Sequence, residues 1–245
     1  EDAATRHYLL ARAHLLLVNS VLALEEIRKA LALEEESGHK AYGTPLVEGQ
    51  ALLQLGRYEE AMASFREALA RADAGERPHV LHEMGVAALD HGAYPEAEEH
   101  LRALVREEGY PYLAQAYADL AEALYRQGRY QEAEAAAREA VARGAVAAGE
   151  LVLGHVAYDL LHLEEALEHY RKAAESAEEG SREWVGAQEM VVDTLAQLGY
   201  RFPEEMVRRG QAVLPYLHPA DEWHAALTAY VERAQALLRE GKRLN

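Results

Sequence analysis

Apolar residues recur along this chain with the 3.6-residue period of amphipathic α-helices, in stretches of about four turns separated by short polar breaks. Residues 113–126 are one such stretch. The helix predicted after it has its own apolar stripe, formed by Ala133, Ala137 and Ala140. The pattern therefore predicts an all-α fold made of helices in succession.

The breaks between these helices carry a segment that returns along the chain. Three copies are nearly intact: Gly-Arg-Tyr-Glu-Glu-Ala at 56–61, Gly-Ala-Tyr-Pro-Glu-Ala at 92–97 and Gly-Arg-Tyr-Gln-Glu-Ala at 128–133. Residues 161–166 are a worn copy, an earlier copy aligns on Ala23, and a degenerate sixth copy occupies residues 199–206. Near-constant spacing of this kind indicates a repeat array.

Each copy has the chemistry of a turn between two packed helices. Glycine suits the positive φ at the end of the first helix, and acidic residues suit the start of the second, where the helix dipole favours negative charge. A small residue also stands twelve positions before each closing alanine: Ala11, Gly49, Gly85, Ala121 and Gly154. We expect these small residues to let the two helices of a pair approach closely.

The pattern resembles the tetratricopeptide repeat, although the first copy lacks the turn glycine and the sixth breaks the spacing. The resemblance implies a right-handed superhelical solenoid of about six helix-turn-helix repeats, forming a single domain over residues 1–245. The expected repeats lie at approximately 3–37, 41–75, 77–109, 113–144, 148–180 and 182–216. A capping helix is expected at 220–240, ended by Gly241.

In this family the first helix of each repeat lines the concave face, where peptides or helices bind. Carried onto this chain, the family positions predict a groove formed by Tyr8, Arg12, Gln50, Gln54, His79, His82, Asp90, Gln115, Glu122, Tyr125, Arg126, His155, Tyr158 and Asp159. The degenerate sixth repeat adds Glu189 and Asp193 in a less defined register. Exposed tyrosine and arginine are typical of interfaces, whereas the alternative is a solvated groove that binds nothing.

The composition narrows the class of partner. The formal net charge is −17, which argues against binding of nucleic acid or anionic membranes and favours a neutral or basic partner. Of the 42 Asp and Glu residues, 25 fall on the predicted second helices, so the groove is less acidic than the total suggests. Scarce Asn and absent Cys fit a thermophilic bacterial source. The chain is also rich in Ala and Arg, which a GC-rich bacterial genome would produce as well.

Catalytic and metal-binding motifs are absent from the sequence. There is no cysteine, no phosphate-binding glycine loop and no zinc-protease helix motif, and His79 with His82 gives two ligands without a third. We therefore predict no enzyme activity, no cofactor and no metal. The lysine and asparagine clamp with which some family members grip acidic C-termini is also missing.

The predicted function is a scaffold that binds a peptide or helix of another protein in its groove. Two alternatives remain open: a regulatory module of a longer transcription regulator or signalling protein, and a self-assembling protein that forms homo-oligomers. No run of 18 apolar residues occurs, so no membrane span is expected. We expect a cytoplasmic location, and the first residue, Glu1, leaves open an upstream signal or domain.

Overall fold

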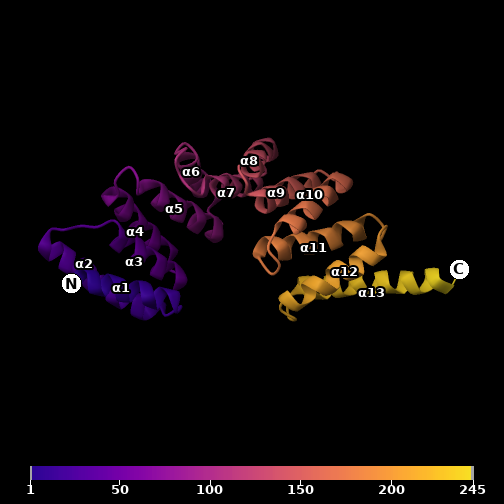
Figure 1. The fold of residues 1–245 in the computed structure, drawn as a ribbon, viewed down its shortest axis with the longest axis horizontal. Coiled ribbons are helices and arrows are strands. Elements are labelled where there is room, and N and C mark those ends of the chain that lie inside the picture. Colours follow the sequence, from indigo (N-terminus) through magenta and orange to yellow (C-terminus); the bar gives the residue numbers. More distant parts are fainter. Residues whose placement is uncertain (1, 244–245) are drawn as a thin grey trace. The chain divides into compact units, whose positions relative to one another are not determined.

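The computed structural model describes residues 2–243, which form thirteen α-helices and one short 3₁₀ helix without any strand (Figure 1). The first helices of the pairs are α1 (Ala3–Leu16), α3 (Gly43–Gln54), α5 (Arg77–His91), α7 (Leu113–Arg126), α9 (Val146–Asp159) and α11 (Arg182–Gln197). The second helices are α2 (Ser20–Ser37), α4 (Tyr58–Arg71), α6 (Tyr94–Leu104), α8 (Tyr130–Ala142), α10 (Leu163–Ser176) and α12 (Pro203–Val213). The 3₁₀ helix η1 (Leu214–Tyr216) then precedes α13 (Glu222–Arg243). The prediction of an all-α fold with six helix pairs and a C-terminal helix is confirmed.

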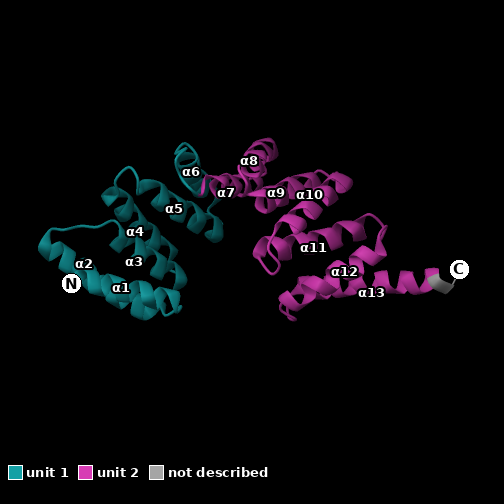
Figure 2. Ribbon diagram, viewed as in Figure 1, with its two compact units in different colours: residues 1–111 teal, residues 112–245 magenta. Residues whose placement is uncertain are grey.

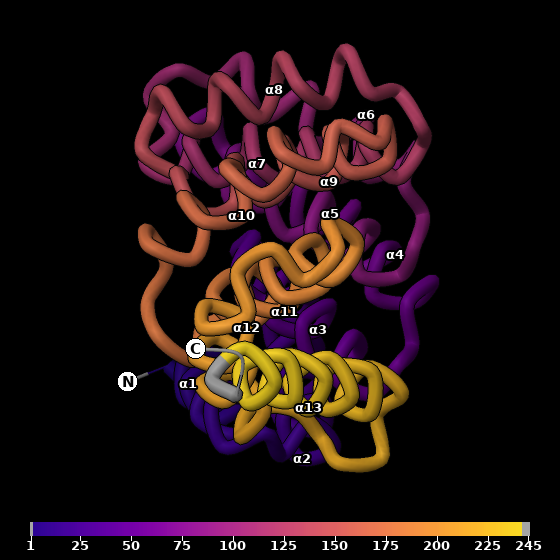
Figure 3. The backbone as a smooth tube through the Cα atoms, turned by 90° about the vertical axis from the view of Figure 1, so that its right-hand side faces the viewer, coloured from indigo at the N-terminus to yellow at the C-terminus, as the bar shows by residue number. Residues whose placement is uncertain are grey.

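The helices form two compact units, residues 1–111 and residues 112–245 (Figure 2). In unit 1 each first helix packs against its second helix, and α2 and α4 pack against the helix that follows them. In unit 2 the same arrangement continues through α12, which packs against α13 (Figure 3). The single domain over residues 1–245 stays a prediction, and residues 1, 244 and 245 of that span lie outside the described residues.

The turns within the pairs use the backbone conformation expected of the repeated glycine. Gly56, Gly92 and Gly128 have φ values of 72°, 81° and 72°. In the first and fifth pairs the same position is occupied by Val18 at φ 55° and Leu161 at φ 61°. The turn therefore keeps its shape without glycine, at the steric cost that a side chain incurs in the left-handed region.

Close packing between the two helices of a pair depends on the small residues predicted from the sequence. A Cβ atom added to Gly49 would lie 2.4 Å from the Phe65 ring, and one added to Gly85 would lie 2.7 Å from the Leu101 side chain. Phe65 and Leu101 are themselves fully buried. Each glycine therefore makes room for a large side chain sixteen residues later.

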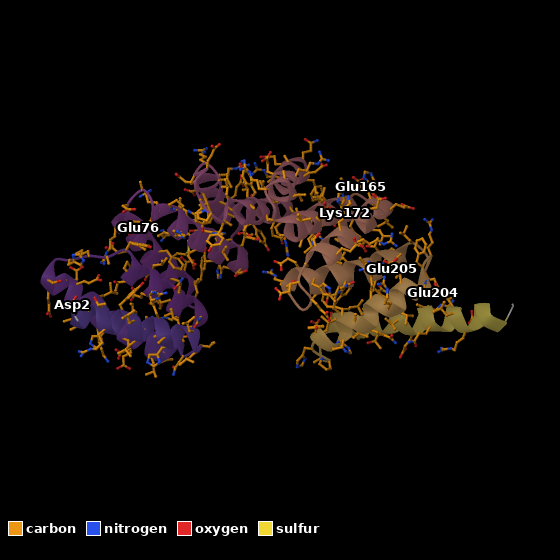
Figure 4. All side chains as sticks on the ribbon, viewed as in Figure 1. Asp2, Glu76, Glu165, Lys172, Glu204 and Glu205 are labelled. Atoms are coloured by element: carbon orange, nitrogen blue, oxygen red, sulfur yellow. The ribbon has the colours of Figure 1, made fainter. Side chains whose placement is uncertain are left out.

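Acidic residues open most of the second helices, as expected from the helix dipole. The first turn of α10 carries Glu164 and Glu165, and that of α12 carries Glu204 and Glu205 (Figure 4). Negative charge in the first turn of a helix interacts favourably with the helix dipole.

Two helix ends differ from the sequence prediction. The second helix of the repeat expected at 77–109 ends at Leu104, before Gly109 and Pro111, and proline disfavours helical backbone in the residue before it. The last helix passes through Gly241 and continues to Arg243, so the prediction that Gly241 ends it is wrong. Glycine is tolerated inside a helix at a modest cost, and here nothing forces a positive φ.

Candidate functional site

Unit 2 contains an open hollow of about 540 Å³, which we call the tyrosine hollow. Its side chains come from three first helices and two second helices: Tyr125, Arg126, Tyr130, His155, Tyr158, Asp159, Tyr170 and Met190, together with Gly128. The predicted groove residues Tyr125, Arg126, His155, Tyr158 and Asp159 are therefore brought together here.

Aromatic rings form a layered stack along the hollow. The Tyr125 and His155 ring centroids are 5.5 Å apart with the planes tilted by 22°. The Tyr125 ring centroid also lies 6.0 Å from that of the Tyr130 ring, with the planes tilted by 29°. Successive helices α7, α8 and α9 thus each contribute one ring, and offset stacking of this kind stabilises the arrangement.

Hydrogen bonds fix the polar ends of these rings. The Tyr158 hydroxyl donates to Asp193 Oδ2 at 2.5 Å, and the Tyr130 hydroxyl donates to Asp159 Oδ2 at 3.0 Å. His155 Nδ1 lies 2.9 Å from the hydroxyl oxygen of Tyr170, a fully buried side chain. Because hydrogen bonds hold Tyr130, Tyr158 and His155, these side chains have little freedom left to lose on binding.

The charges of the hollow follow from burial. Desolvation lowers the pKa of His155 below its ordinary value, so its imidazole is neutral at pH 7. Burial, with the neighbouring Asp159 and Asp193 carboxylates, raises the pKa of Tyr125 and of Tyr158, which keeps both phenols protonated. The hollow therefore combines neutral aromatic faces with carboxylates.

The one cationic side chain at the hollow is engaged by a neighbouring carboxylate. Arg126 Nε donates to Glu122 Oε1 at 2.7 Å, one helical turn earlier on α7. The predicted groove residues Arg126 and Glu122 are therefore paired with each other. Asp159 is the exposed carboxylate among the residues that line the hollow.

Unit 1 has a smaller hollow, of about 220 Å³, built in a similar way. It is lined by Leu53, Tyr58, Asp90 and His91 among others. The Tyr58 and His91 rings stack with centroids 3.8 Å apart and planes within 6°, and the Tyr58 hydroxyl donates to Glu96 at 2.8 Å. Predicted residue Asp90 is thus placed beside a turn tyrosine, as Asp159 is placed beside Tyr130.

Other predicted residues of unit 1 lie on α1 and α3. Arg12 lies 5.7 Å from the centroid of the Tyr8 ring, and Gln54 accepts a hydrogen bond from Ser20 at 2.6 Å. Gln50 is half-buried on α3.

The two predicted histidines of α5 meet one buried tyrosine. His82 Nδ1 lies 2.8 Å from the hydroxyl oxygen of Tyr110, and the exposed His79 ring meets the edge of the same tyrosine with centroids 5.2 Å apart. These histidines are therefore placed by packing and hydrogen bonding. Within residues 2–243, no group of three or more His, Cys, Asp or Glu side chains is arranged to hold a metal ion.

Gln115 lies apart from the tyrosine hollow, although both are in unit 2. Its side chain donates to Asp119 at 2.9 Å and borders a different hollow, of about 430 Å³, beside the start of α9. The family register that placed Gln115 with Tyr125 therefore does not place the two in one pocket.

Sequence reasoning missed Tyr130 and Tyr170, because the family register assigns the groove to first helices only. It also missed Met190, which lies on the first helix α11 in the degenerate sixth repeat, where the register was less defined. A signal for Tyr130 was nevertheless present. Tyr58 and Tyr130 are the same position of the repeated turn segment, and each lines the hollow of its own unit.

Comparison with known proteins identifies the repeat. A sequence model of the tetratricopeptide repeat matches residues 82–148, and a second matches residues 47–74. The chain therefore contains tetratricopeptide repeats. No curated protein matches it in a sequence search.

Solved structures of tetratricopeptide type share the fold at low sequence identity. One comes from a study of PilF of Pseudomonas aeruginosa, with a TM-score of 0.71 and 16% identity over 93% of this chain and 97% of that one. Another is PilW, described as a type IV pilus biogenesis factor. Its TM-score is 0.69, with 16% identity over 93% of this chain and 99% of that one. A thermophilic repeat protein of Thermus thermophilus has a TM-score of 0.58, with 22% identity over 78% of this chain and 99% of that one. None of the described helices of the present chain is long and apolar enough to cross a membrane.

Proposed function

We propose that this tetratricopeptide repeat protein is an interaction scaffold whose tyrosine hollow binds a peptide segment through a basic side chain, arginine or lysine. The observation that carries the proposal is the stack of Tyr130, Tyr125 and His155 beside the exposed carboxylate of Asp159. A cation is attracted both by aromatic faces and by a carboxylate.

The rings are held in place before any ligand arrives. Tyr130 and Tyr158 donate to carboxylates, and His155 is bonded to the buried Tyr170. A preformed pocket loses less conformational entropy on binding than a flexible one, so a short peptide contact is enough for measurable affinity. Tyrosines in such positions are typical anchors of protein interfaces.

The charge of the protein favours the same class of ligand. A net charge of −17 attracts basic segments from solution and repels acidic ones. Inside the hollow His155 is neutral and Arg126 is paired with Glu122, so the local field is not reversed by a positive group. Both the long-range and the local electrostatics therefore support a basic peptide.

A series of peptides that differ at one position tests this proposal. A random peptide library is selected on the purified protein, and the best binder is resynthesised with Arg, Lys, Gln or Glu at its key position. Fluorescence anisotropy should rank Arg and Lys first, Gln lower and Glu last. The affinity should also fall as salt is raised, because the contact is partly ionic.

Two matched variants show whether the hollow is responsible. Asp159→Asn keeps the shape and removes the charge, and should weaken the Arg peptide about tenfold while leaving the Gln peptide nearly unchanged. Glu164→Gln makes the same change of charge at an exposed position at the start of α10, outside the hollow, and should alter neither. Selection of acidic peptides, or equal affinity of the Asp159→Asn and wild-type proteins for the Arg peptide, would contradict the proposal.

A further inference from the structure

The first helix pair exposes a series of large apolar side chains, which we call the N-terminal apolar edge. It consists of Leu9, Leu10, Leu16, Leu17, Val18, Val21 and Leu22. Leu16 is 85% exposed and Leu17 is 76% exposed. Leu9 and Leu16 are seven residues apart and so share one face of α1, while the other members follow in the turn and in the first turn of α2.

Part of this edge is the face with which later repeats stack. Ala13 lies between Leu9 and Leu16 on α1 and is exposed. The same repeat position is occupied by Ala51, which is fully buried, by Ala87 at 4% exposure, and by Ala123, which is also fully buried. Ala51 lies on α3, which packs against α1 and α2, and Ala87 lies on α5, which packs against α4. The α1 face is therefore shaped to receive packed helices.

The rest of the edge departs from the chain's own repeat. In the second pair Gln54 stands where the first has Leu16, and Gly56 stands where the first has Val18. Both positions are exposed in both pairs, so burial within the pair does not require the apolar residues. Val18 also takes a φ of 55°, which is strained for a β-branched residue and easy for glycine.

The start of α2 departs in the same way. It has no acidic residue in its first turn. Acidic residues occupy the first turn of every other second helix: Glu59 and Glu60, Glu96, Glu132, Glu164 and Glu165, and Glu204 and Glu205. Where the second pair has Glu59 and Glu60, α2 has Val21 and Leu22. The favourable interaction of acids with the helix dipole is thus replaced by exposed apolar surface.

Charge distinguishes this edge from the remainder of the protein. Residues 3–24 contain Arg6 and Arg12 and no Asp or Glu, in a chain with a net charge of −17. Two copies that meet through most other surfaces would bring negative charges together. At the N-terminal apolar edge residues 3–24 add no acidic side chain to that repulsion, and apolar area is available for burial on both copies.

We propose that the N-terminal apolar edge is an isologous dimer interface, in which a second copy of this chain covers it with the same residues. A two-fold contact places the α1 stripe of one copy against the α1 stripe of the other, so that Leu9, Ala13 and Leu16 pack between helices as small and large residues do in helix pairs. This interface is independent of the tyrosine hollow, which belongs to unit 2.

The repeat itself supplies a variant that should keep the fold. Leu16→Gln, Val18→Gly, Val21→Glu and Leu22→Glu install together the residues of the second pair, Gln54, Gly56, Glu59 and Glu60. The fold of the monomer should be at least as stable, because glycine relieves the positive φ and the acids suit the helix start.

Sedimentation equilibrium from about 1 µM to about 1 mM, a range that covers weak to moderate affinities, measures the association. The wild type should approach twice its monomer mass as the concentration rises. The four-residue variant should raise the dissociation constant at least about 100-fold, because Val21→Glu places like charges opposite each other across a two-fold contact. Its melting temperature should not fall below that of wild type at a concentration where both proteins are monomeric.

A control variant carries similar changes at another exposed turn. Leu160→Gln with Leu161→Gly removes exposed apolar side chains from the α9–α10 turn and should leave the dimer unchanged. Because the chain has no cysteine, Ala13→Cys should form an intermolecular disulfide under mild oxidation much faster than Ala70→Cys, an exposed position on α4.

Three results would overturn the proposal. The first is a wild-type protein that stays monomeric over the whole range. The second is a dimer that persists in the four-residue variant or that fails to crosslink through Ala13→Cys. The third is a monomer that binds vesicles of phosphatidylcholine and phosphatidylglycerol through the same residues, which would assign the edge to a lipid surface.

Discussion

Replacing Gly154 by alanine should destabilise the protein, although alanine favours a helix more than glycine does. Gly154 lies in the middle of α9, and a Cβ atom built on it would lie 2.5 Å from Cε1 and 2.6 Å from Cδ1 of the Tyr170 ring. Tyr170 is fully buried and its hydroxyl oxygen lies 2.9 Å from His155 Nδ1. Burial and this hydrogen bond therefore hold the ring where it would meet the added Cβ atom.

Two opposing contributions set the magnitude. Alanine in place of glycine inside a helix stabilises by about 1 kcal/mol. Forcing an additional methyl group into a packed core costs about 1–3 kcal/mol, and a contact of this shortness against a rigid ring belongs to the upper half of that range. The net result is a loss of about 1 kcal/mol, which lowers the melting temperature of a chain of this size by about 2–4 °C.

Gly186→Ala is the matched control, since Gly186 lies inside α11 with no heavy atom within 4 Å of an added Cβ. It should gain the helix preference alone and raise the melting temperature by about 2–4 °C. Circular dichroism during heating and during urea titration measures both variants. If Gly154→Ala is as stable as Gly186→Ala, the account of close helix approach at this glycine is refuted.

Three further changes test other parts of the structure. Burial raises the pKa of Glu189 to about 7, so the folded protein binds more protons than the unfolded one above the ordinary value of 4.5, and stability should fall as pH rises through that window. Glu189→Gln should therefore raise the melting temperature at about pH 8 and not at about pH 4. The control Glu175→Gln, at an exposed position, should leave the melting temperature unchanged at both pH values. A gain for Glu189→Gln at both pH values would contradict the raised pKa of Glu189. Leu161→Gly should stabilise by about 0.5–1 kcal/mol in urea unfolding, because the side chain is 80% exposed and φ is 61°, and a loss of stability would show that the turn is not strained. Arg71→Met should lower the free energy of unfolding by about 3 kcal/mol, because it leaves the buried Glu34 carboxylate without the guanidinium that lies 3.0 Å away. Adding Glu34→Gln should restore much of that loss. If it does not, the ion pair is not the cause.

Much of the fold could be predicted from local chemistry that repeats along the chain. The turn glycines Gly56, Gly92 and Gly128 take the positive φ that made them informative, and the small residue Gly49 faces the large residue Phe65 across its pair. These features depend on the nearest helix only, so one repeat is enough to interpret them.

Features that depend on the next helix were harder to predict. Tyr130 on α8 reaches Asp159 on α9, and Tyr158 on α9 reaches Asp193 on α11. No spacing in the sequence indicates which carboxylate each hydroxyl meets. The burial of Tyr110 beside His82 was missed for the same reason, since Tyr110 lies in the connection after α6 and not in the repeat pattern.

Strained turns form a third class. Val18 and Leu161 occupy a glycine position without being glycine, and the sequence alone made those copies look worn. The surrounding helix packing keeps the turn in place when its preferred residue is absent. A repeat can therefore persist in the structure after its signature has been lost from the sequence.

Amide hydrogen exchange on the complex with a library-selected basic peptide tests the central claim most directly, because it locates the bound segment without a mutation. The account predicts slower exchange in the C-terminal halves of α7 and α9, around Tyr125 and Tyr158, with the middle of α6 and of α12, neither of which lines the tyrosine hollow, unchanged. Protection confined to those second helices, or none beside the tyrosine hollow at saturating peptide, would contradict it.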